Sequence, residues 1–230
     1  MADHAPNGDE RRLTKGAQAA FDAAGIEAGR LLFAQGCRFV SGAAELSGLP
    51  PPGLPEVAFA GRSNVGKSSL LNALTGRRAL ARISRTPGRT QQINFFDLGG
   101  RLMLVDLPGY GYARAAKTRI SAWQALVDAY LQGRATLRRV CLLIDARHGL
   151  KPLDWAVMAR LDAAAVSYQV VLTKADKADA LADIRAAIAG ALGTHPAAHP
   201  EVLHTSALAG TGIAELRARL AALANPPGKG

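Results

Sequence analysis

Short apolar runs alternate with amphipathic segments along most of this chain. The runs are rich in Val, Leu and Ile, which is typical of strands buried on both faces of a sheet. The segments between them place apolar residues three and four positions apart, which predicts helices with one buried face. The predicted strands are 57–60, 93–98, 102–105, 140–144, 166–172 and 201–204, with 37–40 as a further candidate. The predicted helices are 27–34, 69–74, 118–131, 153–164, 178–191 and 212–224.

The order of these elements predicts the fold class. Strands that alternate with helices favour a mostly parallel sheet covered by helices on both faces. A short turn at Gly99 and Gly100 separates the runs 93–98 and 102–105, which predicts a hairpin and therefore one antiparallel strand. We expect an α/β fold with a mostly parallel six-stranded sheet.

Both ends of the chain lack this periodicity. Residues 1–26 are polar and rich in Ala and Gly, and residues 225–230 are rich in Pro and Gly. We therefore expect a flexible N-terminal extension, one domain over 27–224, and a flexible tail. The first residues show no apolar signal core, and no stretch reaches the roughly 18 apolar residues of a membrane span. A cytoplasmic protein without stable membrane association is expected.

Composition changes this picture in three ways. Aromatic residues make up only 5% of the chain and hydrophobic residues 49%, so we expect a mainly aliphatic core. The net charge of +10 indicates a polyanionic partner, either nucleic acid or an anionic membrane. Cys37 and Cys141 are the only cysteines, and we expect buried free thiols in a reducing compartment.

The strand 57–60 leads into a G-x-x-x-x-G-K-S pattern, and a predicted helix follows. In this context glycines let the backbone pass close to phosphate oxygens, and the amides at the helix start point at the anion. Lys67 is expected to reach the β- and γ-phosphates, and the Ser68 hydroxyl to bind Mg²⁺. The loop consists of Gly61, Arg62, Ser63, Asn64, Val65, Gly66, Lys67 and Ser68.

Two further segments at predicted strand ends indicate which nucleotide binds. Ligands of open α/β sheets bind at the carboxyl ends of strands, so the segment 173–176 can share a site with the distant loop at 61–68. The Asp176 carboxylate can accept from both guanine donors, N1–H and N2–H, which adenine lacks, and therefore selects GTP over ATP. The segments are Thr173, Lys174, Ala175 and Asp176, and then Thr205, Ser206 and Ala207, which can offer an amide to guanine O6.

A D-x-x-G pattern follows the strand 102–105 at the same expected edge. Asp106 is expected to hold Mg²⁺ through water, and the Gly109 amide to contact the γ-phosphate, because a glycine lets the backbone approach closely. From the residues alone, either Thr86 or Thr90 can complete the Mg²⁺ shell. The pattern comprises Asp106, Leu107, Pro108 and Gly109.

Taken together, these motifs resemble a Ras-like P-loop GTPase, and more narrowly the EngB/YihA (YsxC) family, which groups with TrmE, Era, EngA and septin-like GTPases. The resemblance covers about residues 30–222. Its motifs are 61–69, 86–91, 94–96, 106–112 and 173–176.

The resemblance implies a Ras-like P-loop GTPase fold and a GTPase that assists assembly of the bacterial large ribosomal subunit, with a link to cell division and septation. It implies Thr90 as the switch threonine on Mg²⁺, and Lys67, Thr90 and Gly109 as the catalytic set. It also implies nucleotide contacts from Gly88, Arg89, Thr90, Gln91 and Gln92.

The position after D-x-x-G holds Tyr110, where Ras-type enzymes use a glutamine to orient water. We therefore expect hydrolysis of GTP to be slow unless K⁺ or a ribosomal partner accelerates it. In related GTPases an asparagine at the position of Asn64 helps to bind K⁺. The alternative is an asparagine that hydrogen-bonds within its own loop.

The positive charge is concentrated in two stretches. Residues 57–96 carry +7 and residues 110–139 carry +5, which leaves −2 for the rest of the chain. This distribution predicts a switch-side surface that binds rRNA in a nucleotide-dependent way. The alternative is an ordinary solvated face.

The leading interpretation is a monomeric GTPase that acts on a precursor of the large ribosomal subunit. Three alternatives stay open: a GTP-gated binding module in which hydrolysis is not essential, an ATP-using P-loop enzyme, and a septin-like polymer. Asp176 argues against the ATP-using enzyme, and the absence of coiled-coil heptads argues against the polymer.

Overall fold

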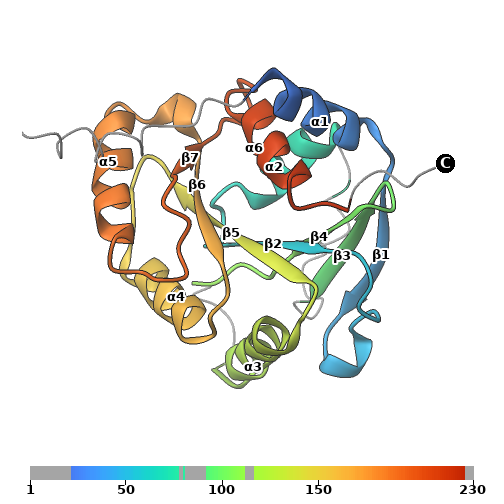
Figure 1. Cartoon of the computed structure of the whole chain (residues 1–230). Coiled ribbons are helices and arrows are strands. Elements are labelled where there is room, and N and C mark those ends of the chain that lie inside the picture. Colours follow the sequence, from blue (N-terminus) through green and yellow to red (C-terminus); the bar gives the residue numbers. More distant parts are fainter. Residues whose placement is uncertain (1–21, 78–79, 81–91, 112–116, 226–230) are drawn as a thin grey trace, which may run out of the picture.

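A computed structural model describes residues 22–77, 80, 92–111 and 117–225, and of 117–123 the backbone only. Seven strands form one sheet in the order β1-β3-β4-β2-β5-β6-β7 (Figure 1). The strands are β1 (Cys37–Ala43), β2 (Glu56–Gly61), β3 (Ile93–Leu98), β4 (Leu102–Asp106), β5 (Leu137–Asp145), β6 (Tyr168–Thr173) and β7 (Leu203–His204). The helices are α1 (Ala23–Ala34), α2 (Lys67–Thr75), α3 (Lys117–Gly133), α4 (Pro152–Ala163), α5 (Leu181–Leu192) and α6 (Ile213–Ala221), with one-turn helices η1 (Leu46–Gly48) and η3 (Ala175–Lys177).

The predicted hairpin and the single antiparallel strand are confirmed. Strand β3 runs antiparallel to both of its neighbours, β1 and β4, and the other adjacent pairs are parallel. The sheet has one strand more than the six expected, because the candidate run 37–40 forms the edge strand β1. Its sequence pattern is weak because Phe39 and Val40 are 39% and 43% exposed on that edge.

Helices cover both faces of the sheet, as predicted. In Figure 1, α1, α2 and α6 lie on one side of the sheet, and α3 and α4 lie on the other. Successive residues of β2 point to opposite faces. Val57 and Phe59 belong to the core beneath α1, α2 and α6, whereas Ala58 and Ala60 belong to the core beneath α3, α4 and α5.

Helix α1 begins at Ala23, four residues before the predicted start at 27. The Asp22 side chain caps it by accepting the Gly25 N–H at 2.7 Å. The helix packs closely on α6, since a Cβ on Gly29 would lie 2.6 Å from the Ala218 nitrogen. The other predicted helices match the observed ones to within three residues at each end; α2 begins two residues earlier than expected, and α6 ends three residues earlier, at Ala221.

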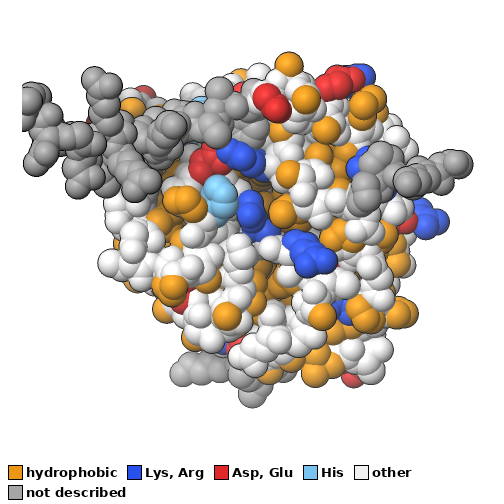
Figure 2. Space-filling view, in the orientation of Figure 1, with side chains coloured by type: hydrophobic (Ala, Val, Ile, Leu, Met, Phe, Trp, Pro, Cys, Tyr) orange, Lys and Arg blue, Asp and Glu red, His pale blue; other side chains and the backbone are white. Residues whose placement is uncertain are grey.

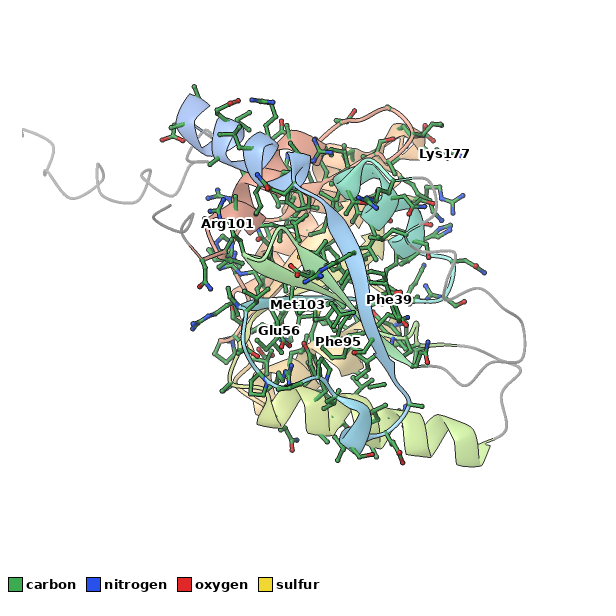
Figure 3. All side chains as sticks on the ribbon, turned by 90° about the vertical axis from the view of Figure 1, so that its right-hand side faces the viewer. Phe39, Glu56, Phe95, Arg101, Met103 and Lys177 are labelled. Carbon is green, nitrogen blue, oxygen red and sulfur yellow. The ribbon has the colours of Figure 1, made fainter. Side chains whose placement is uncertain are left out.

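A buried polar cluster lies at the start of β2, at the end of the sheet where the parallel strands begin. Glu56 is 1% exposed, and its side chain accepts hydrogen bonds from Tyr130 Oη at 2.8 Å, Thr136 Oγ1 at 2.9 Å and Arg134 Nε at 2.8 Å. In Figure 3, Glu56 and Arg101 lie on the opposite side of the molecule from Lys177, which follows the end of β6. This cluster therefore fastens α3 to the sheet far from the strand ends that carry the sequence motifs.

Candidate functional site

The predicted phosphate loop connects the end of β2 to the start of α2. Gly66 has φ +108°, which favours glycine, and it immediately precedes the first helical residue, Lys67. A Cβ on Gly61 would lie only 2.8 Å from Val65 Cγ1, so the turn also requires glycine there. The first N–H groups of a helix have no carbonyl one turn earlier, and the first turn of α2 holds no acidic residue. This geometry fits an anion such as a phosphate.

The D-x-x-G segment lies beside this loop because β4 is the parallel neighbour of β2. Lys67 Nζ and Asp106 Oδ1 form an ion pair, with side chains 13% and 4% exposed. Gly109 approaches the loop closely, since a Cβ there would lie 3.3 Å from the Ser63 nitrogen. The structure therefore brings together Lys67, Asp106 and Gly109, three of the residues predicted for the phosphates and for Mg²⁺. The oxygens of Ser68 and Asp106 suit this hard cation, which prefers oxygen ligands.

Tyr110 joins the D-x-x-G segment to the loop through its main chain. The Ser63 N–H donates to the Tyr110 carbonyl at 2.9 Å, and the Tyr110 N–H donates to the Gly61 carbonyl at 3.2 Å. The residue that replaces the usual glutamine is thus part of the wall of the candidate site.

The segment 173–176 meets the same loop from the end of β6. Thr173 Oγ1 donates to the Val65 carbonyl at 2.6 Å. Lys174 Nζ donates to the Asn64 carbonyl at 2.8 Å and pairs with Asp145 Oδ2 at 2.8 Å. Asp176 lies in η3 with an exposed side chain, so its carboxylate is accessible to a base. Thr173 and Lys174 are about a hundred residues from the phosphate loop in the sequence. Their contacts with it confirm the prediction that the two segments lie together at the carboxyl ends of the strands.

Asp145 lies at the candidate site, where the sequence did not predict it. Burial by itself would raise the pKa of this carboxyl, but hydrogen bonds from Arg147 and Lys174 hold it well below its usual range. The carboxylate therefore fixes the stem of Lys174 beside the phosphate loop. The only signal was its place at the end of the apolar run 140–144, on the edge where the motifs gather.

The segment 205–207 lies against 173–176. The Ala175 N–H donates to the Thr205 carbonyl at 3.1 Å, and Thr205 Oγ1 donates to the Leu172 carbonyl at 2.9 Å. Ser206 is fully buried, and its Oγ accepts the Ala209 N–H at 3.0 Å. Ala207 is partly exposed. The Thr205 and Ser206 N–H groups donate to the Leu172 and Thr211 carbonyls, so the Ala207 N–H is the candidate amide for guanine O6.

Part of the predicted site lies outside the described residues, namely Thr86, Gly88, Arg89, Thr90 and Gln91. Gln92 is described, and its Nε2 donates to Asn94 Oδ1 at 3.1 Å. The Mg²⁺ role of Thr90 and the nucleotide contacts of this segment stay predictions.

The predicted basic surface is only partly on the switch side. Arg134, Arg138 and Arg139 precede or begin β5, at the edge from which the parallel strands start, and Arg134 pairs with Glu56 at 2.6 Å. The expectation of one switch-side surface is therefore wrong for these three residues. The viewer of Figure 2 looks at this far edge, where Lys and Arg side chains gather beside a histidine. Among the remaining cations of the two stretches, the structure describes the side chains of Arg62, Lys67 and Arg77.

Both cysteines are free and buried, as predicted. Burial raises the pKa of Cys37 to about 11 and that of Cys141 to about 12, so both stay protonated at neutral pH. Within the described ranges, no helix is both long enough and apolar enough to cross a membrane.

Comparison with known proteins adds sequence relatives to this geometry. Residues 56–174 match a family model described as "50S ribosome-binding GTPase". A probable GTP-binding protein EngB of Rhodospirillum rubrum is 59% identical over 208 residues, which covers 87% of this chain and 90% of the relative. The corresponding protein of Granulibacter bethesdensis is 58% identical over 204 residues, which covers 88% of this chain and 92% of the relative.

Solved structures share the fold. A crystal structure of a probable GTP-binding protein EngB matches with a TM-score of 0.62 and 23% identity, covering 73% of this chain and 97% of that one. Era in complex with MgGDPNP and part of 16S ribosomal RNA matches with a TM-score of 0.57 and 22% identity, covering 76% of this chain and 58% of that one. The α/β architecture is thus that of P-loop GTPases.

Proposed function

This chain belongs to the EngB family of GTP-binding proteins, and we propose that its GTPase cycle assists assembly of the large ribosomal subunit. The observation that carries the proposal is the match of residues 56–174 to a model of 50S ribosome-binding GTPases. The net charge of +10 supports a partner rich in phosphate. The finer proposals are that the protein acts as a cytoplasmic monomer, without stable membrane association, and is needed for normal cell division and septation.

The proposed mechanism begins with nucleotide binding. Asp176 accepts the two guanine donors, the amides of 61–68 surround the phosphates, and Lys67 leaves Asp106 to reach the β- and γ-phosphates. Ser68, Thr90 and, through water, Asp106 would hold Mg²⁺, which neutralises charge on the phosphate oxygens. The Gly109 amide contacts the γ-phosphate, so the position of the D-x-x-G segment depends on whether GTP or GDP is bound.

Hydrolysis is proposed to be slow in the isolated protein. Tyr110 has no side-chain amide with which to orient water, and its main chain is bonded to Gly61 and Ser63. Acceleration would come from the ribosomal partner or from K⁺ near Asn64. Equal GTPase rates in Na⁺ and K⁺ buffers, with and without ribosomal subunits, would exclude the role of K⁺.

The test is co-sedimentation with purified large subunits and their precursors. We expect association in the presence of a non-hydrolysable GTP analogue, loss of association with GDP, and weakening between low and moderate salt. Small subunits serve as the control. Equal association with both nucleotides, or with both subunits, would contradict the proposal.

Tyr110 also favours a second candidate, a GTP-gated module that binds the subunit and is released by nucleotide exchange rather than hydrolysis. A variant that binds GTP without hydrolysing it distinguishes the two. Normal subunit assembly with that variant would favour the binding module.

A further inference from the structure

A side-chain hydrogen bond links Tyr110, the residue after the D-x-x-G segment, to helix α4. The Tyr110 hydroxyl donates to Asp154 Oδ1 at 2.8 Å, and the Lys151 N–H donates to Asp154 Oδ2 at 2.8 Å. Asp154 lies in the first turn of α4 and is 1% exposed. Within the described part of the chain, no cation forms an ion pair with this carboxylate. Burying a carboxylate is costly, so both of its hydrogen bonds matter for its position.

Tyr110 is thereby attached at two points. Its main chain bonds to Gly61 and Ser63 in the phosphate loop, and its side chain bonds to α4. On one side of it, Gly109 lies against the Ser63 amide; on the other, Gly111 has φ +78° and lies close to Leu153. Glycines on both sides let the chain move easily, so Tyr110 is the anchored residue of the segment 109–111.

The hydroxyl of Tyr110 is a constant donor. Burial, together with the negative charge of Asp154, raises the pKa of Tyr110 far above its usual value. The phenol therefore stays protonated across the physiological pH range, and the link does not switch with pH.

We propose that Asp154 is a positioning residue that acts through Tyr110 and favours binding of GTP over GDP. The hydrogen bond holds the segment 109–111 against the phosphate loop, and so keeps the Gly109 amide within reach of a γ-phosphate. GDP has no γ-phosphate, so its affinity does not depend on this placement. If the Gly109 amide is already in position before GTP binds, less conformational entropy is lost on binding. The inference rests on the proposed role of Gly109.

The test measures the Kd of a non-hydrolysable GTP analogue and of GDP, each with Mg²⁺, for the full chain and its variants. Tyr110→Phe keeps the ring and loses the hydroxyl. We expect its Kd for the GTP analogue to rise about tenfold and its Kd for GDP to change less than about twofold.

Two variants of Asp154 should weaken GTP binding to different degrees. In Asp154→Asn the amide oxygen can accept from the Lys151 N–H and the amide nitrogen can donate to the Tyr110 oxygen, so we expect a smaller loss of GTP affinity. Asp154→Ala loses both bonds, and we expect it to match or exceed Tyr110→Phe. The double variant Tyr110→Phe with Asp154→Asn should bind the GTP analogue no more weakly than Tyr110→Phe alone.

Tyr130→Phe is the matched control. The Tyr130 hydroxyl also donates at 2.8 Å to a buried carboxylate, that of Glu56, but at the far edge of the sheet. We expect this variant to lose thermal stability while keeping the wild-type ratio of the two dissociation constants. A purely structural role for Tyr110 would give the same result for Tyr110→Phe.

Gly109→Ala separates failure of this inference from failure of the proposed function. The added methyl group would press on the Ser63 amide, so we expect selective weakening of the GTP analogue. If Gly109→Ala weakens it and Tyr110→Phe does not, the role of Asp154 is wrong and that of Gly109 stands. If neither variant changes the ratio of dissociation constants, both are wrong.

Discussion

Lys67 and Asp106 show how single residues of this site depend on each other. Each is proposed to bind a different part of Mg²⁺–GTP, yet in this structure they pair with one another at low exposure. A buried charge that loses its partner is strongly destabilising. The pair therefore contributes to folding as well as to the proposed nucleotide binding.

Lys67→Ala is expected to lower the free energy of unfolding by about 3 kcal/mol, because it leaves the Asp106 carboxylate buried and unpaired. It also removes the cation proposed for the β- and γ-phosphates. Urea unfolding without nucleotide measures the first effect. In the double variant Lys67→Ala with Asp106→Asn, the stability should partly recover while GTP binding stays lost. Unchanged stability of Lys67→Ala would contradict this account.

At the same scale, the sequence predicts some site residues and not others. Gly61, Lys67 and Asp106 belong to motifs with a characteristic spacing, and the residue types of these motifs together indicate binding of phosphates and Mg²⁺. Asp145 and Asp154 are isolated aspartates, and an isolated aspartate near a strand end or in the first turn of a helix is ordinary. Their roles depend on Lys174 and Tyr110, which only the folded chain brings to them.

At the scale of elements, the contact of α1 with α6 depends on a glycine. Ala forms helices better than Gly, so Gly29→Ala favours the helix alone. Its methyl group, however, would overlap the backbone of α6 at Ala218.

Gly29→Ala is expected to destabilise the protein by about 1–3 kcal/mol through overpacking. Gly190→Ala is the control, since a Cβ at Gly190 in α5 meets nothing within 4 Å. That change should stabilise by about 0.5–1 kcal/mol. Thermal unfolding of both variants measures the difference, and equal shifts of the two midpoints would show that α1 and α6 are not closely packed.

Element prediction succeeded where periodicity was strong and was weakest at the edge of the sheet. The buried strands β5 and β6 are continuous apolar runs. Strand β1 exposes Phe39 and Val40, so its pattern resembles neither a buried nor a half-buried strand. The sequence places the start of α1 four residues too late, because the Ala-rich residues there have no clear apolar face. The cap at Asp22 depends on a local hydrogen bond, which leaves no periodic pattern in the sequence.

At the scale of the whole molecule, the dependence of stability on pH follows from two histidines. Burial, with added repulsion from Arg139, lowers the pKa of His199 below 6.5. Burial, with repulsion from Arg185, lowers that of His204 in the same way. The folded protein thus keeps both imidazoles neutral, while the unfolded chain binds protons near pH 6.5.

Stability should therefore be complete above about pH 6.5 and fall as the pH decreases below it. Urea unfolding at pH 7.5, 6.5 and 5.5 measures this trend. We expect a smaller slope for His204→Gln, which cannot take up the proton. A variant slope equal to that of the wild type would contradict the assignment.

Recognition of guanine at Asp176 is proposed to drive binding to the large ribosomal subunit. Asp176→Asn exchanges one acceptor for a donor, which suits xanthine, where a carbonyl replaces the exocyclic amine of guanine. Co-sedimentation of this variant with large subunits, in non-hydrolysable GTP or XTP analogues, is the most direct measurement. We expect the wild type to associate with the subunit in the GTP analogue and the variant to associate in the XTP analogue. Association of the variant in the GTP analogue at the wild-type level would contradict this proposal.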